Sequence, residues 1–141
     1  VQRSGDHVEI DADAHLLQQA LTNIIRNALE AMGESPAPPG GHRLDLAASS
    51  DSNGNARITI RDTGPGIPPE VLSRMFNPFF TTRHTGTGLG LAIVHRIIDA
   101  HGGRITVEPA RPGSTFTLHI PALHAQAVHV LPHSLATSEV A

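Results

Sequence analysis

Apolar residues recur at helical spacing in two stretches of the chain. In residues 16–32 they fall three or four positions apart, which predicts a helix with one buried face. Asp13 lies just before this stretch and can cap its first turn, and Gly33 ends it. A second helix is predicted from Gly88 to the glycine pair at residues 102–103, with leucine, valine and isoleucine on its apolar face.

Shorter stretches alternate between polar and apolar residues, as half-buried strands do. They cover residues 7–11, 43–47, 56–62, 104–108 and 114–120. A polar turn joins the second to the third as a hairpin, and a turn with proline and glycine joins the last two. This order predicts an α+β fold, a two-layer α/β sandwich in which helices cover one face of a mixed sheet of about five strands.

A long irregular loop separates the third predicted strand from the second helix. It runs for about two dozen residues rich in Gly, Pro and Thr, and a loop of that length is usually functional. Phe76, Phe79 and Phe80 cluster within it, although the whole chain has only four Phe. These side chains anchor one end of a mobile lid or form a small satellite of the core, and the sequence leaves both alternatives open.

The composition mainly excludes certain partners and kinds of site. The chain has 141 residues, enough for one domain, predicted at residues 1–121 with a flexible tail at 122–141. A net charge of −3 disfavours nucleic acid as a partner, and without cysteine there is no disulfide, thiol catalysis or zinc–thiolate site. No segment reads as a membrane span or signal peptide, so no direct membrane contact is expected. Because the sequence begins without Met, we expect it to be cut from a longer protein.

Two asparagines lie one helical turn apart. Asn23 and Asn27 point the same way from the first predicted helix, at the edge of its apolar face. A side-chain amide oxygen is a hard, neutral ligand that suits Mg²⁺ already surrounded by phosphate charge. Two solvated asparagines are the plain alternative, and the spacing alone favours it.

A carboxylate is followed by two glycines where the third predicted strand ends. Asp62 precedes Gly64 and Gly66. A carboxylate accepts a hydrogen bond from the amino group of adenine and repels the carbonyl of guanine, and glycines let the backbone approach a base closely. A strand-ending turn favours the same residues, and on this segment alone it is the stronger interpretation.

A glycine-rich segment, with Gly86, Gly88 and Gly90, leads into the second predicted helix. A helix N-terminus offers free N–H groups and a positive dipole, which the glycines bring close to a phosphate. The Walker pattern Gly-x-x-x-x-Gly-Lys-Ser/Thr is absent, which excludes that type of site, and no Rossmann fingerprint follows the first strand. Arg83, just upstream, either reaches a terminal phosphate or stays a solvated surface residue.

Taken in order, these segments resemble the ATP-binding catalytic domain of bacterial two-component sensor histidine kinases. That family shares the Bergerat fold with gyrase, the heat-shock chaperone ATPases and the mismatch-repair ATPases. The resemblance covers residues 8–121 and rests on Asp-Thr-Gly-Pro-Gly-Ile-Pro from Asp62, Thr-Gly-Thr-Gly-Leu-Gly-Leu-Ala-Ile-Val from Thr85, and Asn-Ile-Ile-Arg-Asn-Ala from Asn23. Phe-Asn-Pro-Phe-Phe-Thr-Thr-Arg from Phe76, with its short lid, looks most like the nitrogen-regulation type of kinase.

The resemblance implies about three helices, a long ATP lid and a role for individual residues. Asn27 would bind Mg²⁺ with support from Asn23, and these two with Arg83 would serve catalysis. Asp62 would bind adenine, assisted by Thr115 through water. The full set implied for ATP binding is Asn23, Asn27, Asp62, Gly64, Gly66, Ile67, Thr82, Arg83, Gly86, Thr87, Gly88, Leu89, Gly90 and Thr115.

The chain departs from the family pattern at several places. Many members carry Lys and Tyr where this chain has Glu30 and Ala31, so phosphate neutralisation falls to Arg83. In the ATPase relatives a glutamate that activates water stands at the position of Asn23, and an amide is a poor base, which favours phosphoryl transfer over hydrolysis. The sequence leaves open whether the first strand of the family fold is missing from this chain.

The implied function is transfer of the γ-phosphoryl group of Mg·ATP to a histidine in two-component signalling. No His-Glu/Asp-x-x-x-Pro acceptor motif is present, so we expect this fragment to bind ATP without autophosphorylating. Its expected partners are a phosphoacceptor and dimerisation domain of the same protein and a cognate response regulator. The expected location is the cytoplasm, with any membrane anchor elsewhere in the full-length protein.

Other interpretations stay open. An anti-sigma serine kinase uses the same fold in a chain of this size, and a non-catalytic module would bind nucleotide or a partner through it. His129 and His133 have the spacing of a metal-binding helix, but no acidic or cysteine partner completes the set. Scattered surface histidines are therefore the favoured interpretation of the tail.

Overall fold

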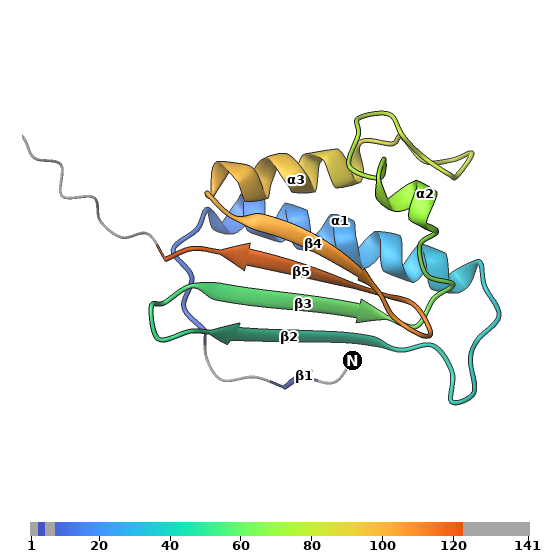
Figure 1. Ribbon diagram of the computed structural model, residues 1–141, viewed down its shortest axis with the longest axis horizontal. Helices are drawn as coiled ribbons and strands as arrows, with labels where there is room; N and C mark the ends of the chain where they lie inside the picture. The colour runs from blue at the N-terminus through green and yellow to red at the C-terminus, as the bar shows by residue number, and fades with distance from the viewer. Residues whose placement is uncertain (1–2, 5–7, 123–141) are drawn as a thin grey trace, which may run out of the picture.

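The computed structural model describes residues 3–4 and 8–122 and shows a sheet with helices on one face (Figure 1). The elements in chain order are β1 (Arg3–Ser4), α1 (Ala14–Gly33), β2 (Leu44–Ser50), β3 (Ala56–Asp62), α2 (Pro69–Leu72), α3 (Gly90–Ala100), β4 (Arg104–Pro109) and β5 (Ser114–Ile120). The sheet order is β1-β2-β3-β5-β4. β1 pairs with β2 in parallel and all other neighbours are antiparallel, which confirms the predicted mixed sheet.

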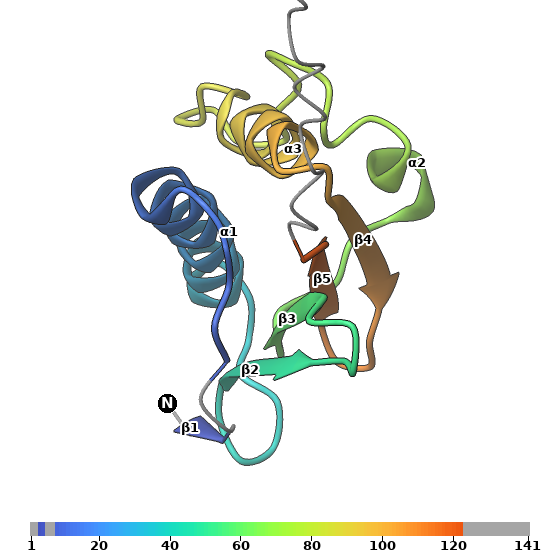
Figure 2. The same ribbon diagram turned by 90° about the vertical axis from the view of Figure 1, so that its left-hand side faces the viewer.

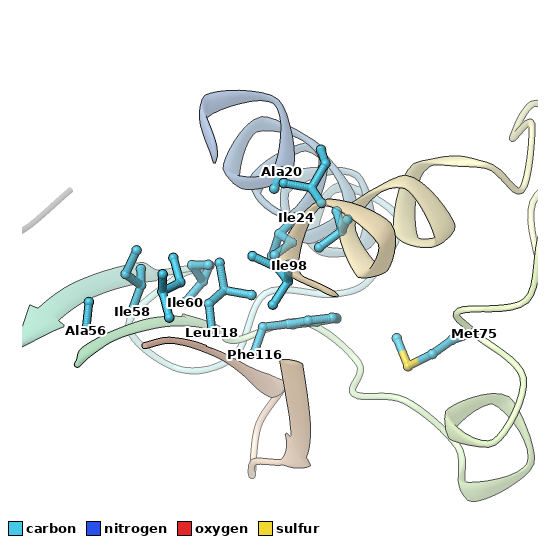
Figure 3. Close-up of a cluster of buried hydrophobic side chains, with 12 residues drawn as sticks. Ala20, Ile24, Ala56, Ile58, Ile60, Met75, Ile98, Phe116 and Leu118 are labelled. Atoms are coloured by element: carbon cyan, nitrogen blue, oxygen red, sulfur yellow. The ribbon is translucent and has the colours of Figure 1, made fainter. Parts of the chain in front are cut away.

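The long helices α1 and α3 lie together against one face of the sheet, as Figure 2 shows. Alternate residues of β3 and β5, including Ile60 and Leu118, point into the layer between sheet and helices and are almost fully buried. Figure 3 shows Ile24 of α1 and Ile98 of α3 meeting them there. Burial of this aliphatic surface is the main driving force for the fold, and Phe116 is the aromatic member of the buried cluster.

Three hydrogen bonds fix the ends of the long helices. Asp13 caps α1 as predicted, because its carboxylate accepts a hydrogen bond from the Leu16 N–H at 2.9 Å. The ring of His101, which follows α3, accepts the Asp13 N–H through Nε2 at 3.0 Å. Its Nδ1 contacts the Ile97 carbonyl oxygen at 2.7 Å, so a neutral ring with its proton on Nδ1 satisfies both partners. The start of α1 is thereby tied to the end of α3.

The structure corrects the sequence-based prediction at two places. Residues 8–11 are not a strand, and the first strand is the two-residue β1. Val8 and Ile10 pack against the core without joining the sheet. The alternating pattern therefore reflects partial burial of these side chains and not pairing with another strand. The short helix α2 was not predicted, because four residues are too few to show a helical period.

The other predicted helices and strands are confirmed to within a few residues. α2 packs Val71 and Leu72 against the same core, so three helices accompany the sheet. The predicted tail from residue 123 onward, with His129 and His133, lies outside the described residues.

Candidate nucleotide-binding site

A buried carboxylate lies where β3 ends. Asp62 is only 4% exposed and stands directly opposite Ser114 of β5. Its Oδ2 accepts the Ser114 hydroxyl at 2.6 Å, and its Oδ1 accepts the Gly64 N–H at 2.9 Å. Each carboxylate oxygen has a second lone pair, so the fixed side chain can still accept a hydrogen bond from a ligand.

Three glycines allow the backbone to close around this carboxylate. A side chain on Gly113 would collide with the Asp62 carbonyl oxygen, and Gly113 has a φ of +94°. A Cβ on Gly64 would lie 3.0 Å from Asp62 Oδ1, and one on Gly66 would lie 3.2 Å from the Gly113 carbonyl oxygen. Only glycine fits these positions without displacing the carboxylate or its supporting backbone.

The structure brings Ser114, not Thr115, to Asp62. Thr115 pairs with Arg61, and successive strand residues face opposite sides of the sheet. Ser114 therefore shares the face of Asp62 while Thr115 points to the side away from the helices. No role was assigned to Gly113 or Ser114 from the sequence, although both directly precede Thr115 in the chain. The pairing of β3 with β5 is what shows that they meet Asp62.

The predicted asparagines lie on α1 beside the start of α3. Asn23 and Asn27 are half-buried, and their side-chain amides make no hydrogen bond to any other described residue. Gly90, the first residue of α3, stands close enough that a Cβ there would lie 3.8 Å from Asn23 Oδ1. Two unengaged amides next to a helix N-terminus fit a hydrated Mg²⁺ bound to phosphates.

The N-terminus of α3 has the features of an anion-binding end. No side chain caps it and no acidic residue lies in its first turn, so its N–H groups and positive dipole are not neutralised locally. Gly88, two residues upstream, has a φ of +71°, and its carbonyl oxygen accepts the Phe79 N–H at 2.8 Å. A side chain on Gly88 would collide with the Phe79 backbone. This contact closes the neck of a loop, residues 79–88, which we call the lid.

Arg83 in the lid reaches across to α1. Its Nη2 lies 3.4 Å from the Asn27 carbonyl oxygen. Its Nη1 contacts Glu30 Oε2 at 2.9 Å and its Nε contacts Glu34 Oε2 at 3.3 Å. The structure thus places the predicted phosphate-binding arginine next to Asn27, but two carboxylates of α1 hold it there. The sequence showed Glu30 as a departure from the family pattern without revealing this pairing.

The remaining predicted residues are distributed around these groups. Thr82, Gly86 and Thr87 are exposed in the lid, and Thr87 Oγ1 accepts the Leu89 N–H at 3.4 Å. Ile67 is half-buried and packs against the core. Together with Gly66 and Arg111 it also lines a hollow of about 510 Å³ next to the Asp62 loop.

α1 connects the two groups of candidate residues. Met32 lies near the end of α1, and its sulfur is 3.8 Å from the hydroxyl oxygen of Thr63, the residue after Asp62. Asn23 lies nine residues earlier, which is about 13 Å along a helix. The buried carboxylate therefore lies beside the last turns of α1, and the two asparagines lie closer to its middle. Arg83 contacts the same last turns through Glu30 and Glu34.

Comparisons with known proteins agree with this geometry. The model of the histidine kinase-, DNA gyrase B- and HSP90-like ATPase family matches residues 12–124. The chain belongs to this family. Sensor histidine kinase ZraS of Escherichia coli strain K12 is 42% identical over 114 residues, which are 80% of this chain and 23% of the relative.

Two solved structures show the same fold. The nucleotide-free catalytic domain of histidine kinase ThkA is 36% identical with a TM-score of 0.72, covering 83% of this chain and 76% of that one. Full-length ShkA in complex with AMPPNP is 34% identical with a TM-score of 0.67, covering 82% of this chain and 23% of that one. These findings confirm the predicted α+β architecture and the resemblance to the catalytic domain of sensor histidine kinases. The nitrogen-regulation subtype stays a prediction.

The chain spans about a quarter of the length of the curated relatives it matches. Among residues 3–4 and 8–122, no helix combines the length and apolar character that a membrane span needs. The same residues contain no group of three His, Asp or Glu side chains placed to hold a metal ion.

Proposed function

We propose that this chain binds Mg·ATP and supplies its γ-phosphoryl group to a histidine on a separate phosphoacceptor domain. The observation that carries the proposal is the arrangement along α1. A buried carboxylate lies beside the last turns of α1, and unengaged amides lie closer to its middle, next to a free helix N-terminus. A lid arginine contacts the helix over Asn27, Glu30 and Glu34. The likeness to ShkA, whose structure holds AMPPNP, supports a nucleotide as the ligand.

Asp62 would select adenine. Its carboxylate is fixed by Ser114 and Gly64 before any ligand arrives, so accepting the adenine amino group needs no rearrangement. Guanine presents a carbonyl oxygen where adenine has this amino group, and two acceptors facing each other in a buried site repel. We therefore expect ATP to bind and GTP to be rejected.

Asn27, supported by Asn23, would hold Mg²⁺ through its side-chain amide oxygen. The bound ion would neutralise charge on the transferring group. The α3 N-terminus and Arg83 would add positive potential from the other side, because both lie next to these asparagines. Arg83 must first exchange Glu30 and Glu34 for phosphate oxygens.

An amide at position 23 favours transfer over hydrolysis. Asn23 does not accept a proton near neutral pH, so it does not activate water. An acceptor imidazole brings its own lone pair: its nitrogen forms a bond to the γ-phosphorus while the bond to the bridging oxygen breaks and ADP leaves. Phe79 is 76% exposed at the lid neck and Leu29 is 55% exposed on α1, so this end of the molecule also offers apolar surface for docking an acceptor domain.

Calorimetry with ATP and GTP in the presence of Mg²⁺ tests nucleotide binding, and radiolabel transfer to a phosphoacceptor hairpin added in trans tests the reaction. Asn27→Ala should abolish transfer and weaken ATP binding. Asn53→Ala, in the exposed turn between β2 and β3, is the matched control and should change neither. Equal binding of GTP would refute the role of Asp62. Label appearing on a serine substrate instead would favour the anti-sigma kinase, and absence of binding would favour a non-catalytic module.

A further inference from the structure

Two arginines and a histidine form a row across the sheet, far from the candidate nucleotide site. Arg57 of β3 stands directly opposite His119 of β5, and Arg104 of β4 stands opposite the same His119. Directly opposed residues share one face and lie about 5 Å apart. Since the adjacent residue Leu118 points into the core, this basic row, Arg57–His119–Arg104, lies on the face away from the helices.

The charges of the basic row are not balanced by the rest of the described chain. Neither Arg57 nor Arg104 forms an ion pair with a described residue. Partial burial of the ring, and then repulsion by Arg104 and Arg57, lowers the pKa of His119. Arg57 and Arg104 both lie next to the same histidine, so binding a proton there is less favourable than in an isolated ring.

The basic row lines a concave surface. A pocket of about 580 Å³ includes all three side chains together with Ser49 and Ser50 of β2. This volume lies within the range of small-molecule sites. The pocket is lined by the start of β3 and by the residues that follow α3. Figure 1 shows these segments at the end of the sheet opposite the lid. Arg57 and Asp62 are five residues apart on β3, which is about 17 Å.

One acidic residue also borders the pocket. The Asp51 carboxylate accepts hydrogen bonds from the Asn55 side chain at 2.8 Å and from the Asn53 and Asn55 N–H groups at 2.9 Å each. The Asn55 side chain, and then the backbone N–H groups, lower the pKa of Asp51, so it stays ionised. It forms no ion pair with Arg57 or Arg104. An anion would therefore bind beside the basic row on β3, β5 and β4, away from Asp51 in the β2–β3 turn.

We propose that the basic row is a second binding site, specific for a small phosphate-bearing molecule. Two arginines flank a histidine within two strand spacings, about 10 Å, so the site fits several negative charges on one compact group. A phosphate monoester carries about −1.5 to −2 charges near neutral pH, whereas a carboxylate carries one. Arginine binds phosphate oxygens in pairs, and Ser49, which stands opposite Arg57, adds a hydroxyl donor at the rim.

The test is a pyrophosphate titration followed by ¹⁵N NMR, with shifts assigned residue by residue because pyrophosphate also fits the nucleotide end. We expect saturable shifts at Arg57, Arg104 and His119. Arg57→Gln and Arg104→Gln should each weaken this binding about tenfold, the loss of one charge-assisted contact. Arg61→Gln is the matched control, because Arg61 lies on the same face of β3 but opposite Asp45 and Thr115, outside the pocket.

Two further measurements separate the outcomes. The ring protons of His119 should report a higher pKa with pyrophosphate bound, since a bound anion stabilises the imidazolium. ATP binding should be unchanged in Arg57→Gln and Arg104→Gln, which distinguishes this site from the nucleotide site. Non-saturating shifts, shifts confined to the lid end, or equal loss in Arg61→Gln would overturn the proposal. Glutarate binding as tightly as pyrophosphate would overturn the phosphate specificity in favour of carboxylate ligands.

Discussion

The base-binding end and the lid of the candidate nucleotide site are built in different ways. Around Asp62 the carboxylate is buried, two neighbours donate hydrogen bonds to it, and Gly113 packs against its backbone. In the lid most side chains are exposed, and Arg83 is held by two carboxylates that are themselves 47% and 63% exposed. One end is fixed by the sheet, and the other rests on surface ion pairs.

This difference indicates which part of the site exists before ATP binds. Sheet hydrogen bonds and close glycine packing do not depend on a ligand, so base recognition is preorganised. Partly exposed ion pairs contribute little, typically below about 1 kcal/mol, and they exchange partners readily. We therefore expect the phosphate end to assemble when the γ-phosphate replaces Glu30 and Glu34 as the partner of Arg83.

The largest expected effect comes from breaking the packing at the base end. In Gly113→Ala the new methyl group meets the Asp62 carbonyl oxygen, in a backbone conformation with φ of +94°. The conformation alone costs about 1–3 kcal/mol, and the collision adds to this. We expect a large loss of free energy of unfolding in denaturant titration, together with loss of ATP binding.

Gly33→Ala is the control for this substitution. Gly33 ends α1, and a Cβ there would meet nothing within 4 Å. Replacing a helical glycine of this kind stabilises a protein by about 0.5–1 kcal/mol. If Gly113→Ala behaved like Gly33→Ala, the base end would not be packed as the structure shows.

The next effect separates base recognition from stability. In Asp62→Asn the amide oxygen can accept the Gly64 N–H and the amide nitrogen can donate to the Ser114 oxygen, so the melting temperature should change little. The carboxylate that would accept the adenine amino group is lost, and ATP affinity should fall about 10- to 100-fold in calorimetry. Asp45→Asn on β2 is the control. Unchanged ATP affinity in Asp62→Asn would remove Asp62 from base recognition.

The two ends also differ in how far the sequence predicted them. Asp62 and the glycines after it were assigned to base binding through the resemblance, because this segment alone also fits a strand-ending turn. Its partners Gly113 and Ser114 could not be assigned, since the register of β3 and β5 pairs residues 52 positions apart. In the lid the sequence identified Arg83, but ion pairs across about 50 residues leave no periodic signal.

The same reasoning explains the outcome for the fold. The long helices and the hairpins were predicted because each has its own period or turn. The segment at residues 8–11 has the alternation of a strand but pairs with no strand of the sheet, and local pattern does not report pairing. Whether this segment forms a strand depends on long-range pairing, and so does the choice of Ser114 as the partner of Asp62.

A smaller effect comes from releasing the lid arginine. In the double variant Glu30→Gln, Glu34→Gln the two carboxylates that hold Arg83 lose their charge, and their repulsion of bound phosphate is lost as well. ATP affinity should rise about three- to fivefold at low salt, and the gain should shrink at high salt. Glu70→Gln on α2 is the control for a change in total charge. Weaker ATP binding in the double variant would mean that these carboxylates support the site.

The smallest expected effect is on the pH dependence of stability and comes from His119 in the basic row, outside both the base end and the lid. It tests whether the nucleotide site is independent of the basic row. The pKa of His119 is lowered in the folded chain by burial, Arg104 and Arg57, so the unfolded chain binds the proton more readily. Stability linked to His119 is therefore complete above about pH 6.5 and is lost as the pH falls through the lower folded pKa. His119→Gln should flatten this part of the stability profile, whereas His84→Gln in the lid should not. A pH-dependent loss of ATP affinity that disappears in His119→Gln would show instead that the two ends of the sheet are coupled.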